Sequence, residues 1–179
     1  MTAYQTIYED SIDRHGLVTT ARARELGLPP NALALLAHRG RLEHVGRGVY
    51  RLAASLPFAG EIPAYALVVE QVGANAVLWG ESVLAMLGLL AASDPSRIHV
   101  GLPGRLRRRL PEGIVVHPLS AQSAMTEYEG IRSQPVADAL LASRGSVMPD
   151  RLLGAAKKAR EQGFLTAREY AAARKAVSP

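Results

Sequence analysis

Two short stretches with helical spacing of apolar residues follow each other closely in this chain, and this arrangement restricts its fold more than any other feature. The first covers residues 21–26 and the second residues 31–39. Gly27 ends the first stretch, at a position where helices favour a left-handed residue. Leu28-Pro29 then turns the chain, because proline does not continue a helix. Two helices joined by a tight turn are therefore expected.

A β-hairpin is predicted directly after the second helix. Residues 42–45 and 49–52 alternate in polarity, as strands with one buried face do, and Gly46-Arg47-Gly48 separates them. Glycine-rich connections of this length are typical of tight turns, so Arg47 would stand at the tip of the hairpin.

An earlier helix is indicated at residues 4–15, where apolar residues recur at helical intervals before Gly16. Either Thr19 or Thr20 can cap the helix that follows. Together with the two helices and the hairpin, this pattern predicts a winged helix-turn-helix over residues 1–56. The third helix of such a domain enters the major groove of DNA.

The distribution of charge favours a nucleic-acid partner. The chain has 21 Lys and Arg against 16 Asp and Glu, a net charge of +5. Residues 14–52 alone hold seven arginines and two glutamates, so this segment accounts for the whole net charge. Arginine suits planar contacts to phosphate or guanine, although a general preference of the genome for arginine would give the same composition.

Seven side chains of the predicted winged domain are candidates to contact DNA. Its arginines are expected to bind phosphate or the minor groove, or else to form a solvated charged face. Thr20 can donate to a phosphate or simply cap a helix, and Asn31 and His38 can touch base edges. Asn31 is equally suited to capping the third helix. The set comprises Thr20, Asn31, His38, Arg39, Arg41, Arg47 and Arg51.

The remainder, residues 57–179, is long enough for a second domain. Thr166 and Glu169 form a capping box for its last helix. We expect an α+β protein, a winged helix-turn-helix followed by a mixed α/β domain rich in helices. The predicted strands of the second domain are 97–102, 114–117 and 127–132, and the predicted helices are 62–72, 82–90, 135–143, 150–162 and 167–176.

Composition is typical of a globular protein of the cytoplasm. Of the 179 residues, 48% are hydrophobic and 21% charged, and the absence of cysteine excludes disulfides and zinc-thiolate sites. Residues 1–13 lack the basic and apolar parts of a secretory signal. The apolar stretch 72–92 is interrupted by Asn75, Glu81 and several glycines, so no membrane span is expected.

A second basic cluster lies between two predicted strands. Arg105, Arg107, Arg108 and Arg109 stand in a connection bounded by prolines. The cluster would extend the DNA footprint, bind RNA or face an acidic partner, unless it is only a soluble loop. Few aromatic residues are near, which argues against a stacking platform for single strands.

The sequence predicts neither an enzyme nor a cofactor or metal site. It has no glycine-rich phosphate loop and no nucleophile elbow, and its five histidines are scattered. His99 and His117, in neighbouring predicted strands, can approach each other as ordinary half-buried histidines. A nuclease tethered to DNA is an alternative that would gather Glu127, Glu129 and Asp138 around a metal, but no lysine accompanies them in sequence.

Several motifs of the predicted winged domain resemble one protein family. They are His15-Gly16, the Ala-Arg-Glu-Leu-Gly run that ends at Gly27, Arg39-Gly40-Arg41-Leu42 and Gly46-Arg47-Gly48-Val49-Tyr50. In this order they resemble the N-terminal domain of AbiEi-type antitoxins, which belong to type IV toxin-antitoxin modules of abortive infection. Residues 78–89, 98–103 and 134–140 are more loosely similar to the same family.

The resemblance implies a repressor that binds double-stranded DNA at its own promoter. Its C-terminal antitoxin domain, residues 57–179, would counteract a nucleotidyltransferase-like toxin directly or indirectly. Two copies on inverted half-sites, a homodimer on DNA, would suit such a repressor. The third helix departs from a basic recognition helix, since its first turn has no Lys or Arg. A stand-alone winged-helix transcriptional regulator with a ligand-responsive C-terminal domain is the alternative.

Overall fold

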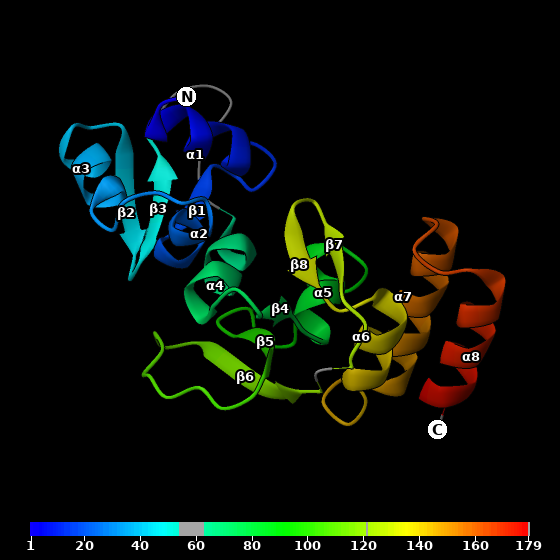
Figure 1. Ribbon diagram of the computed structural model, residues 1–179. Helices are drawn as coiled ribbons and strands as arrows, with labels where there is room; N and C mark the ends of the chain where they lie inside the picture. Colours follow the sequence, from blue (N-terminus) through cyan, green and yellow to red (C-terminus); the bar gives the residue numbers. More distant parts are fainter. Residues whose placement is uncertain (54–62, 121, 179) are drawn as a thin grey trace. The chain divides into compact units, whose positions relative to one another are not determined.

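The computed structural model describes residues 1–53, 63–120 and 122–178 (Figure 1). The chain divides into two compact units, Met1–Ala74 with Glu129–Ile131, and Asn75–Tyr128 with Arg132–Pro179. The domain boundary predicted at residues 56 and 57 lies outside the described residues. Both units contain helices as well as strands, which confirms the predicted α+β class.

The first unit contains the elements of a winged helix-turn-helix in the expected order. Its strands form an antiparallel sheet in the order β1-β3-β2, in which β3 pairs with both neighbours. The elements are α1 (Ala3–Ser11), β1 (Leu17–Thr19), α2 (Thr20–Glu25), α3 (Ala32–His38), β2 (Leu42–Gly46), β3 (Val49–Leu52) and α4 (Ala64–Val72).

An apolar cluster joins the first three helices to the sheet. Ile7 of α1, Val18 of β1 and Leu52 of β3 are fully buried in it. Leu33 and Leu36 bring in α3. Because these two leucines are three positions apart, they lie on one side of α3, so the opposite side of the helix remains exposed.

The first helix is shorter than predicted. It ends at Ser11 rather than near His15, whose backbone is left-handed with a φ of 56°. The Ser11 hydroxyl donates to the Ile7 carbonyl at 2.7 Å, a local bond that competes with helix continuation. The amides of Arg14 and Gly16 both donate to the Ser11 carbonyl, and these bonds close the turn that leads into β1.

The helix α4 clusters with the first unit and contacts β1. Ala66, Val69 and Val72 form its buried side, at the spacing of a helix face. Glu70 on the same helix accepts a hydrogen bond from Arg14 at 2.8 Å. The sequence places this helix in the predicted second domain, but in the structure it belongs to the first compact unit, which is therefore longer than the winged domain alone.

The second unit contains, among its described residues, a five-stranded mixed sheet in the order β6-β5-β4-β8-β7. β5 runs antiparallel to β4 and parallel to β6, while β4 runs parallel to β8. The strands are β4 (Val77–Leu78), β5 (Ile98–Pro103), β6 (Ile114–Leu119), β7 (Thr126–Tyr128) and β8 (Ile131–Ser133).

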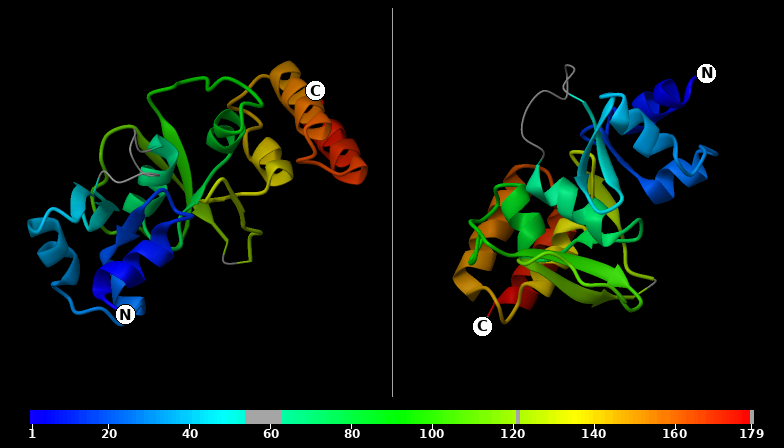
Figure 2. Two further views of the ribbon diagram at one scale, coloured as in Figure 1. Left: turned by 90° about the horizontal axis from the view of Figure 1, so that it is seen from above. Right: turned by 90° about the vertical axis from the view of Figure 1, so that its left-hand side faces the viewer.

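Helices of the second unit pack on one another beyond the sheet. Its helices are α5 (Glu81–Met86), α6 (Val136–Ala142), α7 (Pro149–Glu161) and α8 (Ala167–Val177). α6 contacts α5, α7 and α8, and α7 lies beside α8 (Figure 2). The capping box predicted for the last helix is confirmed, since Thr166 accepts from the Glu169 amide and the Glu169 carboxylate accepts from the Thr166 amide.

Two features of this sheet differ from the sequence prediction. β4 was not predicted, because its two residues are too few to show an alternating pattern. The strand expected at 127–132 is a hairpin, since Glu129 and Gly130 have φ values of 51° and 75° and turn the chain. Over the described ranges, no helix is long and apolar enough to cross a membrane.

Candidate nucleic-acid interface

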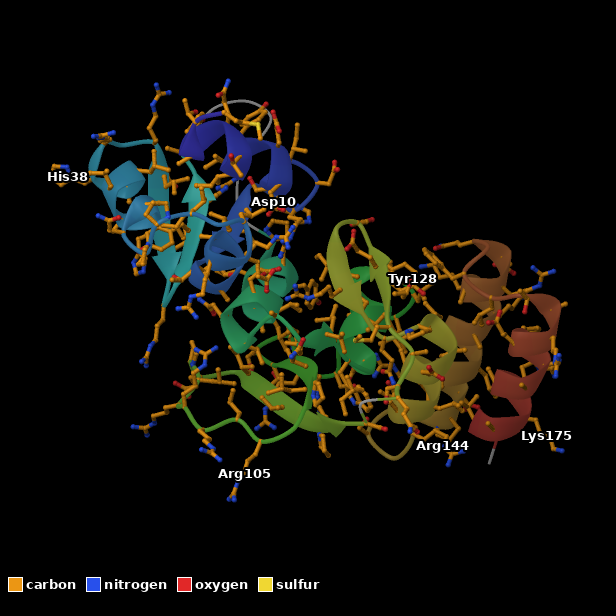
Figure 3. All side chains as sticks on the ribbon, viewed as in Figure 1. Asp10, His38, Arg105, Tyr128, Arg144 and Lys175 are labelled. Carbon is orange, nitrogen blue, oxygen red and sulfur yellow. The ribbon has the colours of Figure 1, made fainter. Side chains whose placement is uncertain are left out.

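The exposed side of α3 is the part of the first unit that is suited to a DNA groove. Asn31, Ala34, Leu35 and His38 are all exposed on it, opposite the buried leucines. His38 points away from the domain at the end of the helix (Figure 3). Asn31 occupies the N-cap position without a side-chain capping bond, so its amide is not used for that purpose.

The turn of the β2–β3 hairpin is tied to the start of α2. The backbone N–H of Thr20 donates to the Gly48 carbonyl at 2.9 Å, and the Thr20 hydroxyl donates to the same oxygen at 3.3 Å. Thr19 is the residue that caps α2, because its hydroxyl accepts from the Arg22 amide at 3.1 Å. The hairpin thus has a fixed position against the helix-turn-helix, and the exposed Arg47 lies at its tip.

Exposed arginines stand at both ends of this hairpin. Arg39 follows α3 and Arg41 precedes β2, whereas Arg47 lies beyond the far end of that strand. A five-residue strand spans about 17 Å at roughly 3.3 Å per residue, comparable to a major groove about 12 Å wide. Arg39 and Arg41 are thus separated from Arg47 by about the length of this strand.

The Arg41 guanidinium packs over the ring of Tyr4, 5.1 Å from its centroid. The attraction of a cation to the face of an aromatic ring holds the guanidinium near α1. This contact with the ring is not a conventional hydrogen bond, so it leaves the N–H donors of Arg41 for other partners.

Arg51 occupies a different surface from the other predicted contacts. Tyr50 and Leu52 pack against the helical core, so Arg51, between them in β3, points to the other face of the sheet. It is half-buried and lies across from Glu43 in the neighbouring strand. Among the seven candidates it is the one that the strand pairing separates from the exposed side of α3.

Two further arginines of the basic segment form ion pairs inside the unit. Arg22 binds Asp10 at 2.6 Å and Glu25 at 2.9 Å, and these carboxylates raise the pKa of its guanidinium, Asp10 most strongly. Arg14 binds Glu70 at 2.8 Å and lies 3.6 Å from Asp10. The positive charge of these two side chains is thus largely compensated within the domain.

Arg24 and Leu35 belong to the candidate interface but were not singled out from the sequence. Arg24 is exposed on α2, four positions after Thr20, and both line a small hollow with Pro30 at the start of α3. The i, i+4 spacing from Thr20 was a signal for Arg24. Leu35 gave none, because an apolar residue in an amphipathic pattern is expected to be buried.

The second basic cluster lies in the connection between β5 and β6. Arg105, Arg107 and Arg109 are exposed, whereas Arg108 is half-buried, as are the leucines that alternate with them. Arg105 extends outward from this loop (Figure 3). One side of the loop is therefore half-buried, and the other presents arginines to solvent.

His99 and His117 do come together, as their predicted strands allowed. Nδ1 of His99 lies 2.8 Å from Nε2 of His117, and His117 stacks on Trp79 with ring centroids 5.7 Å apart. Burial, and secondarily the charge of His99, lower the pKa of His117. In the part of the chain that the structure describes, no three His, Asp or Glu side chains are grouped to hold a metal ion.

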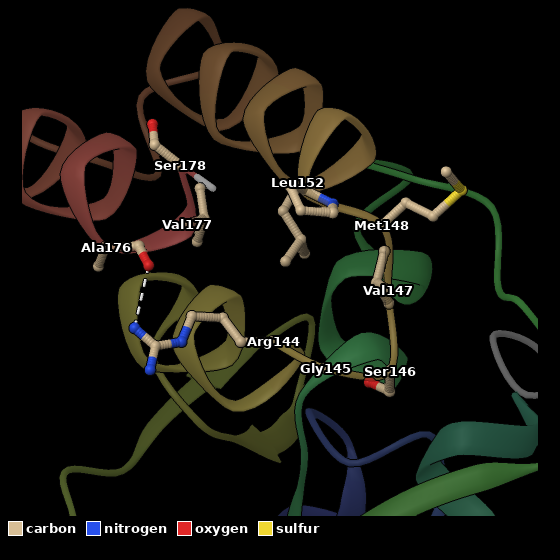
Figure 4. Close-up of a pocket in the computed structure, with 10 residues that line it drawn as sticks. Arg144, Gly145, Ser146, Val147, Met148, Leu152, Ala176, Val177 and Ser178 are labelled. Carbon is tan, nitrogen blue, oxygen red and sulfur yellow. Dashed lines mark hydrogen bonds between the residues drawn. The ribbon is translucent and has the colours of Figure 1, made fainter.

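A pocket of about 580 Å³ opens in the second unit (Figure 4). Val147, Leu152 and Val177 give it an apolar lining, and Arg144 borders it while donating to the Ala176 carbonyl at 2.9 Å. This volume lies within the range of small-molecule sites.

The three helices, the antiparallel sheet and the anchored hairpin of the first unit define a winged helix-turn-helix domain. Residues 7–53 match a family model described as a transcriptional regulator, AbiEi antitoxin, so this segment of the chain is similar to that family. The match confirms the resemblance predicted from the sequence motifs.

Other comparisons add little to this assignment. No curated protein is significantly similar to the chain. Among solved structures, the RV2827C protein from Mycobacterium tuberculosis is similar over 100% of this chain and 83% of that chain, with 17% sequence identity and a TM-score of 0.38. The similarity to the AbiEi family rests on residues 7–53.

Proposed function

We propose that the protein is an antitoxin that represses its own operon. Its winged domain binds operator DNA upstream of its gene, and the chain beyond it counteracts a nucleotidyltransferase-like toxin encoded beside it. The observation that carries the DNA-binding part is the exposed side of α3 flanked by Arg39, Arg41 and Arg47. In this role the protein carries out no catalytic step, and it acts in the cytoplasm.

In the proposed complex, α3 lies in the major groove and the hairpin reaches the neighbouring groove or backbone. The arginines fix the register on the phosphates, and Asn31 and His38 face base edges. Thr20 holds the turn of the β2–β3 hairpin, the wing of the domain, through its hydrogen bond to Gly48. In the proposed complex Thr20 also faces the DNA. A homodimer would place two such surfaces on inverted half-sites.

A gel-shift titration with the DNA just upstream of the gene tests this proposal. Wild type should bind this DNA more tightly than a scrambled duplex, and its affinity should fall steeply with salt. Arg47→Ala should weaken binding and reduce the salt slope by about one. Arg168→Ala, which changes an exposed arginine on α8, is the matched control and should leave both unchanged. Equal binding of operator and scrambled DNA would contradict the proposal.

Co-expression with the neighbouring gene tests the antitoxin part. Arg47→Ala in the full chain should relieve repression yet still protect cells, because the substitution leaves the second unit intact. Co-elution of the two proteins would support direct neutralisation, and protection without co-elution would support the indirect mode. Loss of protection by a folded Arg47→Ala protein would contradict the division of labour between the two parts.

The pocket in the second unit favours one other candidate, a transcriptional regulator that responds to a small ligand. A site of about 580 Å³ lined by Val147, Leu152 and Val177 is large enough for such an effector. This candidate predicts no toxin gene beside its own, and an effector that changes operator affinity. Narrowing the pocket with Val147→Phe should remove the effector's influence without changing affinity for operator DNA.

The loop that carries Arg105, Arg107 and Arg109 is a separate element of the proposal. If it extends the DNA footprint, changing all three to alanine should lower the salt slope in the same titration. If it faces an acidic partner, the triple variant should bind DNA normally and lose protection in the co-expression assay.

A further inference from the structure

We propose that Leu35 recognises thymine through its C5-methyl group, so that an A·T pair lies opposite the middle of α3. This inference rests on the proposed DNA binding and specifies which bases the winged domain reads. It makes Leu35 a specificity-determining residue for the operator.

The position of Leu35 carries the inference. It lies at the middle of α3 on the exposed side, flanked by Asn31 and Ala34 on the N-terminal side and by His38 on the other. Leu35 is 44% exposed, while Leu33 and Leu36 of the same helix are 3% and 9% exposed. The leucine therefore contributes little to the core and presents an apolar group where a recognition helix meets base edges.

The chemistry of this helix face excludes the commonest way of reading guanine. α3, which the structure describes in full, carries no lysine or arginine, so it offers no bidentate donor to guanine O6 and N7. An apolar side chain in the major groove instead contacts the methyl group of thymine, and asparagine pairs with adenine N6 and N7. Leu35 and Asn31 thus both favour A·T pairs.

The surrounding charge indicates that the partner of this apolar face is DNA. Arg39 and Arg41 stand at one end of the hairpin and Arg47 at the other, all exposed. An apolar protein partner would leave these cations facing no opposite charge, whereas the two phosphate strands that border a groove match them.

Replacing thymine by deoxyuridine isolates the proposed contact, because it removes only the C5-methyl group from the major groove. The probe is the duplex from upstream of the gene that wild type protects from nuclease, synthesised with thymine or with deoxyuridine throughout. Gel-shift titrations of wild type, Leu35→Ala and Leu141→Ala on both duplexes give the affinities. Leu141 on α6 is a matched control, since it is 41% exposed and belongs to the second unit.

Wild type and Leu141→Ala should bind the deoxyuridine duplex more weakly, by roughly fourfold for each methyl group that the leucine covers. Leu35→Ala should bind the thymine duplex more weakly than wild type and discriminate less between the two duplexes. Alanine favours helix, so this variant should keep the melting temperature of wild type.

Each other outcome overturns the inference in a recognisable way. Salt-dependent binding that Arg47→Ala weakens, but that is equal on both duplexes, would overturn the role of Leu35 and leave the proposed function standing. Full discrimination by Leu35→Ala would assign the methyl contact to another residue. If Leu35→Ala is a monomer where wild type is a dimer, and it still discriminates fully between the thymine and deoxyuridine duplexes, Leu35 would belong to a contact between two copies of the chain. Absence of salt-dependent binding would overturn the proposed function itself.

Discussion

The backbone N–H of Thr20 donates a hydrogen bond of 2.9 Å to the carbonyl oxygen of Gly48, which joins the first residue of α2 to the turn of the wing. Gly48 is left-handed, with a φ of 70°, and a Cβ atom built on it would lie 3.3 Å from the Thr20 hydroxyl oxygen. The position of the wing therefore depends on a glycine.

Gly48→Ala should strain this turn and weaken operator binding. A non-glycine residue in the left-handed region costs about 1 kcal/mol, and the new methyl group would also press on Thr20. Urea unfolding measures the stability loss, and the gel shift measures the change in affinity. Gly27→Ala is the control, because Gly27 has a φ of 73° with open space around it. It should lose similar stability but keep its DNA affinity, and equal DNA affinity for both variants would contradict the role of the wing turn.

Thr19→Ala should destabilise the protein by about 1 kcal/mol, the usual cost of losing an N-cap. The Thr19 hydroxyl accepts from the Arg22 amide, whereas the exposed hydroxyl of Thr20 makes a longer bond to the wing. Thr19→Ser should restore most of the loss, and Thr20→Ala should cost clearly less. Urea midpoints of the three variants check the order; a larger loss for Thr20→Ala would reverse the assignment of the cap.

Asp10→Asn should lower stability by roughly 2 kcal/mol, within the range for hydrogen bonds between charged groups. Asp10 has a side chain only 11% exposed and holds Arg22 at 2.6 Å. Glu161→Gln, which changes an exposed partner of Lys157 at 4.0 Å, is a control and should have little effect. Thermal melts at low and high salt measure the stability of the two variants. Equal losses for Asp10→Asn and Glu161→Gln would show that the half-buried pair contributes no more than the exposed one.

Acidification should destabilise the surroundings of His117. The pKa of His117 is lowered in the folded protein, so the unfolded chain binds this proton more readily. Stability from this group is therefore complete above the ordinary histidine pKa of about 6.5 and is lost as the pH falls through the lower folded value. The 2.8 Å contact between Nδ1 of His99 and Nε2 of His117 acts in the same direction. If both imidazoles were charged, an N–H donor on each ring would face the other.

The fluorescence of Trp79 reports directly on the protonation of His117, because Trp79 is the only tryptophan of the chain and stacks on His117. Its fluorescence should titrate with a midpoint below pH 6.5 in wild type. His117→Gln should remove the transition, and His38→Gln, which changes an exposed histidine of α3, should not. A transition that persists in His117→Gln would assign the titration to another group.

The winged domain could be predicted because its signals are local. The glycine after α2, the Gly46-Arg47-Gly48 turn and the strands beside it each lie within a few residues of the structure that they specify. Burial on one side of α3 was likewise visible as periodicity.

The roles of individual arginines could not be predicted, because they depend on partners distant in sequence. Arg14 meets Glu70, and Arg22 meets Asp10, only after the helices have packed. The direction of Arg51 follows from which face of β3 the helices cover. The seven predicted DNA contacts stay predictions, with their positions now known. The exposure of Leu35 depends in the same way on how α3 packs.

The attachment of α4 to β1 affects how the gene should be dissected. A fragment that begins at residue 57 would carry α4 without the sheet beneath it, with Ala66, Val69 and Val72 uncovered. We expect such a fragment to aggregate, and its failure to protect cells would then carry no information about antitoxicity. Point substitutions in the full chain avoid this error, and a truncation should instead separate Ala74 from Asn75, where the two compact units meet in sequence.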